Sequence, residues 1–432
     1  MRVKFSLVSL LFLLICSFHI VSASTAAELL AVKATSENSG EALPAIEELR
    51  SLGPAGLETL RRQYGNEIDR HIANPTLAVT SEWQRITVAL DAVSQQRNSY
   101  VSGLYWYTDI DQAKKAAAES GRPILSLRLL GKLTDELSCA NSRFFRTVLY
   151  ANNSVSATLR DHFVLHWQMV RPVPLITIDF GDGRKLERTI TGNSIHYVLD
   201  SDGKVIESLP GVYGPAAFSR ALANAESLFV SLKGKSYVEK QALFTNYYRS
   251  RVDQISVAWL EDVKTIGGKQ PEGVSILVNE KGEALSIMPL AVSKAVTEAT
   301  VLRAMTAGSD ALGRITDEQA WRKIAALHSK DSVLDQQSIA LIKKQNPQLD
   351  SKAFSDMLDG FQKSVALDSV RNEYCMHSQL LAWMSRETWR NDLEKFNEKV
   401  YAELFLTPKS DPWLGLLMPN TYNAIDSGGV VK

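Results

Sequence analysis

The chain has 432 residues, of which 45% are hydrophobic and 22% charged, a composition typical of globular proteins rather than disordered chains. Its length predicts two or three domains. Lysine plus arginine and aspartate plus glutamate both number 48, so the basic excess of nucleic-acid-binding proteins is missing and we expect no nucleic-acid partner.

Residues 1–23 are typical of a signal peptide. Arg2 and Lys4 precede an apolar run over 7–21, and small residues ending at Ala23 offer a cleavage site. The alternative is an uncleaved membrane anchor, but the run is shorter than the roughly 20 apolar residues that a spanning helix prefers. We therefore expect a periplasmic or secreted protein with no stable membrane insertion after cleavage.

Residues 24–99 are predicted to form a helical N-terminal segment. Ile46, Leu49 and Leu52 recur at helical spacing, the break at 53–54 separates them from the next apolar stripe, and a third stripe starts at Trp83. One pair of short helices is too few for a helical-repeat array, which needs about three repeats. We interpret the segment as a helical cap packed on the following domain.

From residue 100 the pattern changes to alternating strands and helices, which predicts an α/β domain over 100–232. The predicted elements are a strand at 104–107, a helix at 108–120, a strand at 124–130, a helix starting near Cys139, strands at 163–167 and 195–199, a return strand from Val205 and a helix from Pro215. Residues 171–192 alternate around a Gly-Asp-Gly turn and predict an inserted β-hairpin.

Several motifs occur in an order that resembles exported thioredoxin-like domains. They are Trp106, Asp109 and Ala113, then Gly121-Arg122-Pro123-Ile124-Leu125, Cys139-Ala140-Asn141-Ser142, Phe163-Val164, Val198-Leu199-Asp200-Ser201-Asp202-Gly203-Lys204-Val205 and Gly211. The resemblance covers about residues 100–230 and implies a thioredoxin-like central domain with Cys139 at a helix N-terminus. Two departures stand out. Ser142 replaces the family's second motif cysteine, and Asn193-Ser194 stand where the family has a cis-proline.

Residues 233–432 are predicted to be mostly α-helical. The spacing from Thr316 to Gln319 indicates a capping box ahead of an amphipathic helix. Further helices are expected at 333–345, 351–365, 367–385 and 388–404, a short strand pair within 272–290, and an irregular tail around Trp413.

Cys139 is the main candidate for chemistry, with Ser142 as its partner in the motif. A helix N-terminus stabilises a thiolate, the species that reacts in disulfide exchange. Because Ser142 cannot form a disulfide, the motif would support monothiol exchange, isomerisation or trapping. The alternative is a buried thiol in a fold reused for binding. Cys375 is interpreted as a buried structural cysteine, or else as a distant resolving cysteine.

No cofactor or metal is expected. The seven histidines are scattered without ligand spacing, and His162 and His166 are interpreted as structural or surface residues. The acidic residues Asp179 and Asp182 are better explained by a hairpin turn than by a calcium loop. Sequence signatures of phosphate-binding loops, serine hydrolases and zinc peptidases are missing.

Two functions from different classes remain open. The first is a non-catalytic interaction or assembly protein with protein partners, in which the thioredoxin-like fold, the 171–192 hairpin and the helical flanks serve as a docking surface. It predicts that changes in the hairpin or in the Trp413 tail impair function. The alternative is a monothiol thiol–disulfide exchange protein with Cys139 as nucleophile. It requires solvent access to that cysteine. An unrelated enzyme housed in the C-terminal helices has no support from particular residues.

Overall fold

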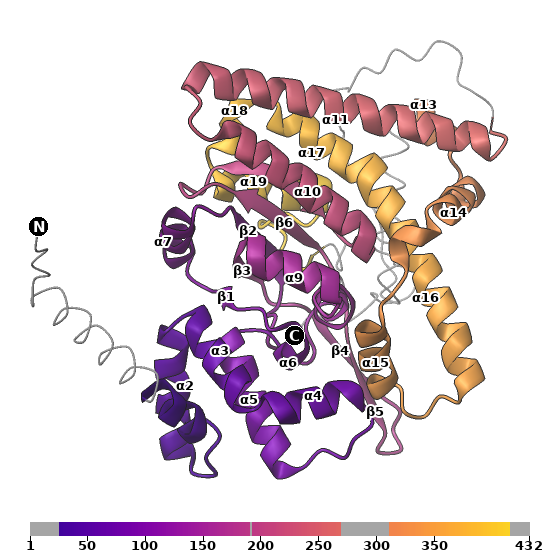
Figure 1. The fold of residues 1–432 in the computed structure, drawn as a ribbon. Coiled ribbons are helices and arrows are strands. Elements are labelled where there is room, and N and C mark those ends of the chain that lie inside the picture. The colour runs from indigo at the N-terminus through magenta and orange to yellow at the C-terminus, as the bar shows by residue number, and fades with distance from the viewer. Residues whose placement is uncertain (1–25, 191, 269–310, 415–432) are drawn as a thin grey trace, which may run out of the picture.

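The computed structural model describes residues 26–190, 192–268 and 311–414. The expected signal peptide and the expected strand pair at 272–290 lie outside these ranges. A helical N-terminal region lies at one end of a mixed central sheet, and the C-terminal helices lie along another side of it (Figure 1). The chain therefore combines helices with a mixed sheet, as expected for an α/β protein.

The N-terminal helices are α2 (Ser39–Ser51), α3 (Pro54–Gln63), α4 (Gly65–Ala73), α5 (Ser81–Ser94) and the short α6 (Ser99–Ser102). Their shared core contains Ile46, Leu49, Leu57, Leu60, Trp83, Ile86, Leu90 and Val93. Leu52, however, is 48% exposed, so its place in the predicted stripe is wrong. The reason is that α2 ends at Ser51, and Gly53 turns the chain with a φ of 69° before Pro54 starts α3.

The central sheet has the order β1-β3-β2-β6-β7. Its strands are β1 (Trp106–Tyr107), β2 (Ile124–Leu130), β3 (Val164–Arg171), β6 (Ser194–Leu199) and β7 (Val205–Pro210). β1, β3 and β2 are parallel to each other, whereas β6 runs antiparallel to β2 and β7 antiparallel to β6. All seven residues of the central strand β2 are buried, which explains its nearly unbroken apolar sequence.

The strand predicted at 104–107 is shorter than expected. Only Trp106 and Tyr107 pair with β3, while Leu104 and Tyr105 are buried against neighbouring cores. The following helix α7 (Ile110–Ser120) begins two residues later than predicted. Asp109 caps it, because its side chain accepts hydrogen bonds from the main-chain N–H groups of Asp111 and Gln112.

Helices cover both faces of the sheet (Figure 1). One face packs against α9 (Asn153–His162), α10 (Pro215–Leu232) and the π-helical segment η1 (Phe145–Leu149). On the other face, α7 and the helices near the C-terminal end complete a second core. Residues of the C-terminal helices belong to both cores, so these helices are part of the packing around the sheet.

In its described ranges, 233–268 and 311–414, the C-terminal part of the chain is mostly helical, as predicted. Its elements are α11 (Tyr237–Thr265), α13 (Ala311–Ile315), α14 (Glu318–Leu327), η2 (Ser329–Ser332), α15 (Gln336–Gln345), α16 (Ser351–Arg371), η3 (Asn372–His377), α17 (Ser378–Met384), α18 (Glu387–Arg390), α19 (Leu393–Lys399) and η4 (Val400–Leu404). The predicted break between 365 and 367 is wrong, because α16 runs on through the π-helical η3 into α17. The single helix predicted at 388–404 is instead interrupted where Asp392 caps α19.

The predicted capping box is also wrong. The N-cap of α14 is Asp317, whose carboxylate accepts a hydrogen bond from the main-chain N–H of Ala320. The hydroxyl of Thr316 instead donates to the carbonyl of Leu312 and accepts from the indole N–H of Trp259. A tertiary hydrogen bond from a helix distant in sequence thus takes the place of the local capping interaction.

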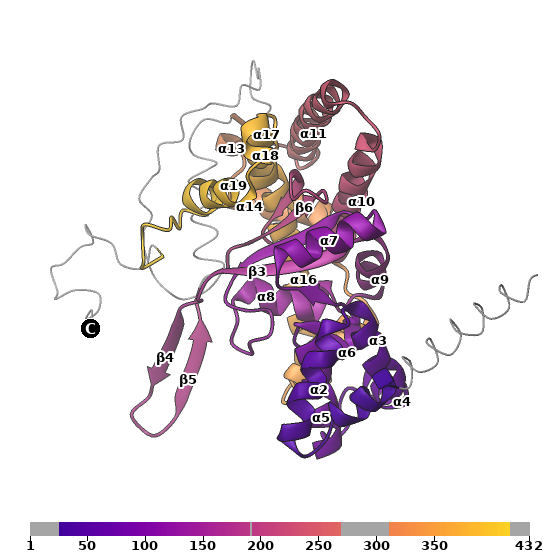
Figure 2. The same cartoon turned by 90° about the vertical axis from the view of Figure 1, so that its left-hand side faces the viewer.

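The inserted hairpin is present. It consists of β4 (Leu175–Asp179) and β5 (Lys185–Thr189), which pair only with each other and extend away from the rest of the molecule (Figure 2). At its tip, Asp179 accepts a hydrogen bond from the main-chain N–H of Gly181, and Asp182 accepts one from that of Arg184. These acidic side chains therefore stabilise the turn, as expected.

Candidate functional site: the Cys139 motif and the buried charge clusters

Cys139 is the N-cap residue of the short helix α8 (Ala140–Phe144). The main-chain N–H of Ser142 points at the sulfur, with 3.4 Å between the nitrogen and Sγ. The buried guanidinium of Arg146 donates to the carbonyls of Leu133, Asp135 and Glu136, which fixes the loop that leads to Cys139. Burial lowers the pKa of Arg146 to about 10, so it stays charged at neutral pH. A helix N–H and a nearby cation are the groups that favour a thiolate.

The sulfur-bearing and polar residues of the motif are inaccessible to solvent, whereas Ala140 is partly exposed. The side chains of Ser138, Cys139, Asn141 and Ser142 are each 0% exposed. Among the described residues, no hydrogen-bond partner reaches the hydroxyl oxygens of Ser138 and Ser142 or the carbonyl oxygen of the Asn141 side chain. Nucleophilic attack on a partner's disulfide requires direct contact with the sulfur, and this arrangement does not provide it.

The base of the hairpin and the segment before β6 cover one side of the motif. Thr189 donates its hydroxyl to the carbonyl of Ser138, at 3.1 Å. The side-chain amide of Asn141 donates to the hydroxyl of Ser194, at 2.8 Å. A Cβ added at Gly192 would lie 2.9 Å from the Asn141 side chain, so any larger residue there would collide with the motif. Asn193 and Ser194 occupy the position at which the resemblance would place a cis-proline, and no described peptide bond is cis.

The end of the described chain covers the other side. The hydroxyl of Tyr401, in η4, donates to the carbonyl of Asn193 at 3.3 Å. The guanidinium of Arg171, the last residue of β3, donates to the carbonyls of Thr407 and Asp411. Residues 400–411 are thereby held across the end of the sheet at which Cys139 lies. We refer to residues 400–411 as the C-terminal strap.

Cys375 lies in η3, where it is buried. Cys139 and Cys375 are both thiols, so no disulfide joins them. The prediction that Cys375 is a buried residue is confirmed, and the structure gives no support for its role as a resolving cysteine.

The sequence analysis missed a cluster of buried charges, which lies at the edge of the sheet formed by β7. His377 in η3 is 1% exposed and lies between two carboxylates. Its Nδ1 is 2.8 Å from Glu373, one helical turn earlier, and its Nε2 is 3.1 Å from Glu207 on β7. The i, i+4 spacing of Glu373 and His377 was visible in the sequence. Nothing in the sequence placed Glu207 beside them, because 166 residues separate Glu207 from Glu373.

Other side chains complete this cluster. Tyr247 of α11 donates to Glu207 at 2.6 Å, Arg251 of α11 pairs with Glu373 at 2.9 Å, and Tyr213 donates to Glu373 at 3.4 Å. Burial alone would lower the pKa of His377, but the charges of Glu373 and Glu207 raise it to about 10. Burial raises the pKa of Glu373, but His377 and Arg251 outweigh it and hold that pKa at about 2. At neutral pH the histidine is therefore a cation between two carboxylates.

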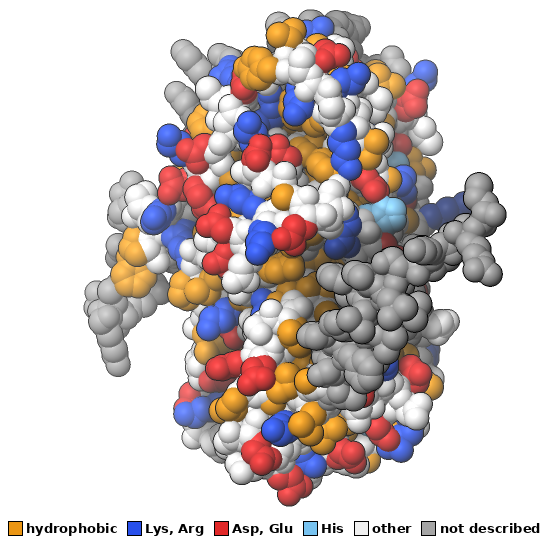
Figure 3. Space-filling view, turned by 60° about the vertical axis from the view of Figure 1, so that its left-hand side comes forward, with side chains coloured by type: hydrophobic (Ala, Val, Ile, Leu, Met, Phe, Trp, Pro, Cys, Tyr) orange, Lys and Arg blue, Asp and Glu red, His pale blue; other side chains and the backbone are white. Residues whose placement is uncertain are grey.

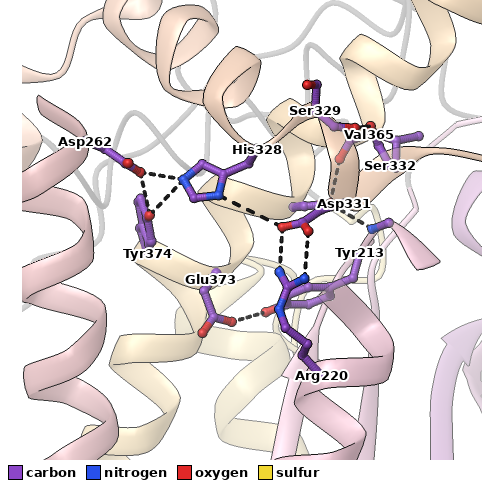
Figure 4. Close-up of polar contacts among 12 residues, drawn as sticks. Tyr213, Arg220, Asp262, His328, Ser329, Asp331, Ser332, Val365, Glu373 and Tyr374 are labelled. Carbon is purple, nitrogen blue, oxygen red and sulfur yellow. Dashed lines mark hydrogen bonds and ion pairs between the residues drawn. The ribbon is translucent and has the colours of Figure 1, made fainter. Parts of the chain in front are cut away.

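A second polar cluster lies next to the first (Figure 4). Nε2 of His328 is 2.6 Å from Asp262, and the hydroxyl of Tyr374 donates to the same carboxylate oxygen at 2.6 Å. On the other side of the imidazole, Asp331 forms a two-point ion pair with Arg220, at 2.7 and 2.5 Å. The hydrogen bond to Asp262 raises the pKa of His328. The cluster joins α10, α11, η2 and η3.

These clusters connect elements rather than assemble a reaction centre. Their members come from β7, α10, α11, η2 and η3, and each charge already has an opposite charge or a donor in contact. Within the described residues, no group of three or more His, Cys, Asp or Glu side chains is arranged to hold a metal ion. We therefore interpret the clusters as the polar attachment of the C-terminal helices to the sheet.

The histidines singled out in the sequence are structural or on the surface, as predicted. His166 on β3 is buried and its Nδ1 is 2.8 Å from the hydroxyl of Ser126, and burial lowers its pKa to about 3. His162 is half exposed and pairs with Glu226 at 2.7 Å.

Comparison with known proteins gives no indication of this protein's function. No protein-family model, no curated protein and no solved structure matches the chain. In the part of the chain that the structure describes, every helix is too short or too polar to cross a bilayer.

Proposed function

We propose that this protein is an exported, thioredoxin-like interaction or assembly protein in which Cys139 is structural. The sheet order β1-β3-β2-β6-β7, with three parallel strands followed by two antiparallel ones, supports the thioredoxin-like assignment. So does the position of Cys139 at the start of the helix that follows the central strand β2.

The observation that carries this proposal is the complete burial of Cys139 beneath the hairpin base and the C-terminal strap. A thiol–disulfide exchange protein must bring its thiolate into contact with another protein's sulfur. Here the surface where such a partner would bind is occupied by the protein's own chain.

The hairpin is the surface that we assign to partner binding. Its register places Ile176, Ile178, Phe180 and Leu186 on one face. The polar residues Thr177, Asp179, Lys185 and Glu187 lie on the other, together with Leu175 at the base of the hairpin. Ile178 is 44% exposed and Phe180 54% exposed, although they lie on the apolar face. An isolated two-stranded hairpin is at best marginally stable in water. An apolar face on such a hairpin is therefore well explained by a partner that covers it.

The arginines of the hairpin indicate which charge the partner's surface should carry. Arg184 and Arg188 lie on the same face as the apolar residues. Arg184 stacks on the Phe180 ring, with 5.2 Å between Cζ and the ring centroid, and is already paired with Asp182 at 2.7 Å, so Arg188 is the cation of this face that is left for a partner's carboxylate. Arginine and aromatic residues are enriched at the centres of protein interfaces. We propose a protein partner with an apolar patch bordered by carboxylates.

Site-specific photo-cross-linking in the source cells tests this assignment. A photoreactive amino acid at Ile178 should give a discrete adduct with another protein. The same amino acid at Thr177, the adjacent residue on the opposite face, should give none. Equal adducts from both positions, or none from either, would contradict docking through this face.

A measurement of thiol reactivity separates this proposal from the monothiol alternative, which the N–H of Ser142 and the charge of Arg146 favour. With Cys375 changed to Ser, we expect an alkylating reagent to label Cys139 only after denaturation. Rapid labelling of the folded protein, with a midpoint well below the ordinary thiol value of roughly 8.5, would instead support the exchange activity.

A further inference from the structure

A cavity of about 330 Å³ lies at the end of the sheet opposite Cys139. It is lined by Arg122, which precedes β2, and by the turn that follows β6. Ile124 at the start of β2 pairs with Leu199 at the end of β6, so these segments are neighbours at this end of the sheet. Cavities of about 300 Å³ and more are in the range that binds small molecules.

The walls of the cavity are largely apolar. They include Ala117 of α7, Val205 and Ile206 of β7, Phe229 and Leu232 of α10, and Phe244 of α11. On the face of the molecule in Figure 3, apolar side chains likewise show between interspersed basic and acidic ones. A ligand of this cavity would therefore have an apolar part.

The charged residues of the lining are unbalanced. The basic ones are Arg122, Lys204, Lys233, Lys240 and Arg390, and the acidic ones are Asp200, Asp202 and Glu387. Among the described residues, none of the five bases lies within 4.0 Å of a carboxylate oxygen. Two of the acids are already engaged by donors. Glu387 accepts from Tyr237 and Asn391, and Asp200 accepts from two main-chain N–H groups.

Arg390 gives the strongest indication of a missing anion. Its side chain is buried, with a residue exposure of 3%, and among the described residues its acceptors are the carbonyl of Met384 and the amide oxygen of Gln241. Its guanidinium also lies over the ring of Phe244, 4.3 Å from the centroid. These hydrogen-bond partners are neutral. The nearby carboxylate of Glu387 offsets only part of the cost of burial, so the pKa of Arg390 is still lowered. A buried charge that is incompletely compensated is costly, and an anionic ligand would relieve that cost.

Arg122 points to the same conclusion independently. One of its terminal nitrogens donates to the carbonyl of Arg160, but its Nε is buried and has no acceptor among the described residues. A buried donor without an acceptor carries a desolvation penalty that a bound oxygen would remove.

We propose that this cavity binds a small amphiphilic anion, with its acidic head group at the basic residues and its hydrocarbon part against the apolar wall. The head group is a carboxylate or a phosphate, since guanidinium groups recognise both. This site is separate from the hairpin and from Cys139, so it does not depend on the function proposed above.

Calorimetric titration of the full chain with four eight-carbon compounds tests the proposal. Octanoate, octyl phosphate or both should bind with millimolar or better affinity, and 1-octanol and octylammonium should bind at least about 10-fold more weakly, a difference of ~1.4 kcal/mol. The ratio between the two anions identifies the preferred head group. Equal binding of the alcohol, or no binding of either anion at a few millimolar, would overturn the proposal.

Substitutions locate the bound anion. Arg390→Gln should weaken binding by about 10-fold or more, since it removes a charged donor. Lys240→Ala should weaken it by a smaller factor, whereas Lys115→Ala, an exposed lysine of α7 outside the lining, should leave it unchanged. Because Arg390→Gln could disturb folding, Ala118→Trp provides a second variant. This exposed residue lines the cavity, and the larger side chain should block it with every charge retained. Unchanged binding in a folded Ala118→Trp protein would overturn the assignment.

Discussion

The two helical regions that flank the sheet are attached to it by different physical means. In the N-terminal attachment the hydrogen-bond acceptors are neutral, namely main-chain carbonyls and a side-chain amide. Arg50 donates to the carbonyls of Val93 and Trp106, and the indole N–H of Trp106 donates to Gln96. The C-terminal helices instead place a charged histidine between the carboxylates of Glu207 and Glu373.

This difference has consequences for stability. A hydrogen bond to a neutral acceptor contributes about 0.5–1.5 kcal/mol, or about 1.5–3 kcal/mol when its donor is charged. A buried ion cluster is stable only while each charge retains its partner, and loss of one member leaves the others uncompensated. The C-terminal attachment should therefore be the more fragile one toward substitution and pH.

The largest effect is expected from His377→Ala. It would leave two carboxylates buried without their shared cation, at a cost of about 3–5 kcal/mol in the free energy of unfolding. Urea unfolding measures this cost. His162→Ala, at a half-exposed histidine paired with Glu226, should change it by less than about 0.5 kcal/mol. Similar losses in both variants would show that the cluster does not stabilise the attachment.

The pH dependence should separate the two attachments. The pKa of His377 is raised to about 10, so its contribution is complete below the unfolded value of 6.5 and is lost as pH rises through about 10. The pKa of Glu373 is lowered to about 2, so its contribution is complete above 4.5 and is lost as pH falls through about 2. Both contributions are complete between pH 4.5 and pH 6.5, so the C-terminal attachment should be strongest in that range.

Asp91 in α5 should behave differently. Burial raises its pKa to about 6, although hydrogen bonds from Ser99 and Asn98 oppose the shift. Its contribution is complete below 3.8 and is lost as pH rises through about 6. Hydrogen exchange, corrected for the intrinsic rate, should therefore show α11 and η3 losing protection between pH 7 and pH 9.5 while α5 is unchanged. Parallel loss in both regions would contradict the comparison.

Arg50→Met tests the N-terminal attachment. It removes charge-assisted hydrogen bonds to the carbonyls of Val93 and Trp106, and we expect a loss of about 1.5–3 kcal/mol. Arg62→Met, at an exposed residue paired with Glu28, is the matched control and should cost less than about 1 kcal/mol. A larger loss than that of His377→Ala would reverse the proposed order of the two attachments.

Two adjacent tyrosines of α11 give the last comparison, in which Tyr248→Phe has the smallest expected effect. Tyr247 donates to the carboxylate of Glu207 at 2.6 Å, and Tyr248 donates to the carbonyl of Ile206 at 2.7 Å. Tyr247→Phe should cost about 1.5–3 kcal/mol and Tyr248→Phe about 0.5–1.5 kcal/mol, because only the first acceptor is charged. Equal costs in urea unfolding would mean that the charge of Glu207 contributes little.

Local patterns predicted most of the sheet and its insert. The apolar run of β2 and the alternation of β4 and β5 depend on nearest neighbours and on the side of the strand that faces the core. The predictions that failed were ones in which a distant residue decides the outcome. Thr316 has a capping sequence, yet Trp259 hydrogen-bonds to its hydroxyl and Asp317 caps the helix instead.

The sequence by itself determined the alternation of strands and helices, the position of Cys139 at a helix start and the projecting hairpin, because periodicity and local turn chemistry encode all three. Only the tertiary structure decided that Cys139 is inaccessible, since the residues that cover it, among them Thr189, Asn193 and Tyr401, lie 50 to 262 positions away. It likewise brought Glu207 to His377 and formed the basic cavity around Arg390. Burial and charge pairing depend on three-dimensional distance, which the order of residues along one chain does not specify.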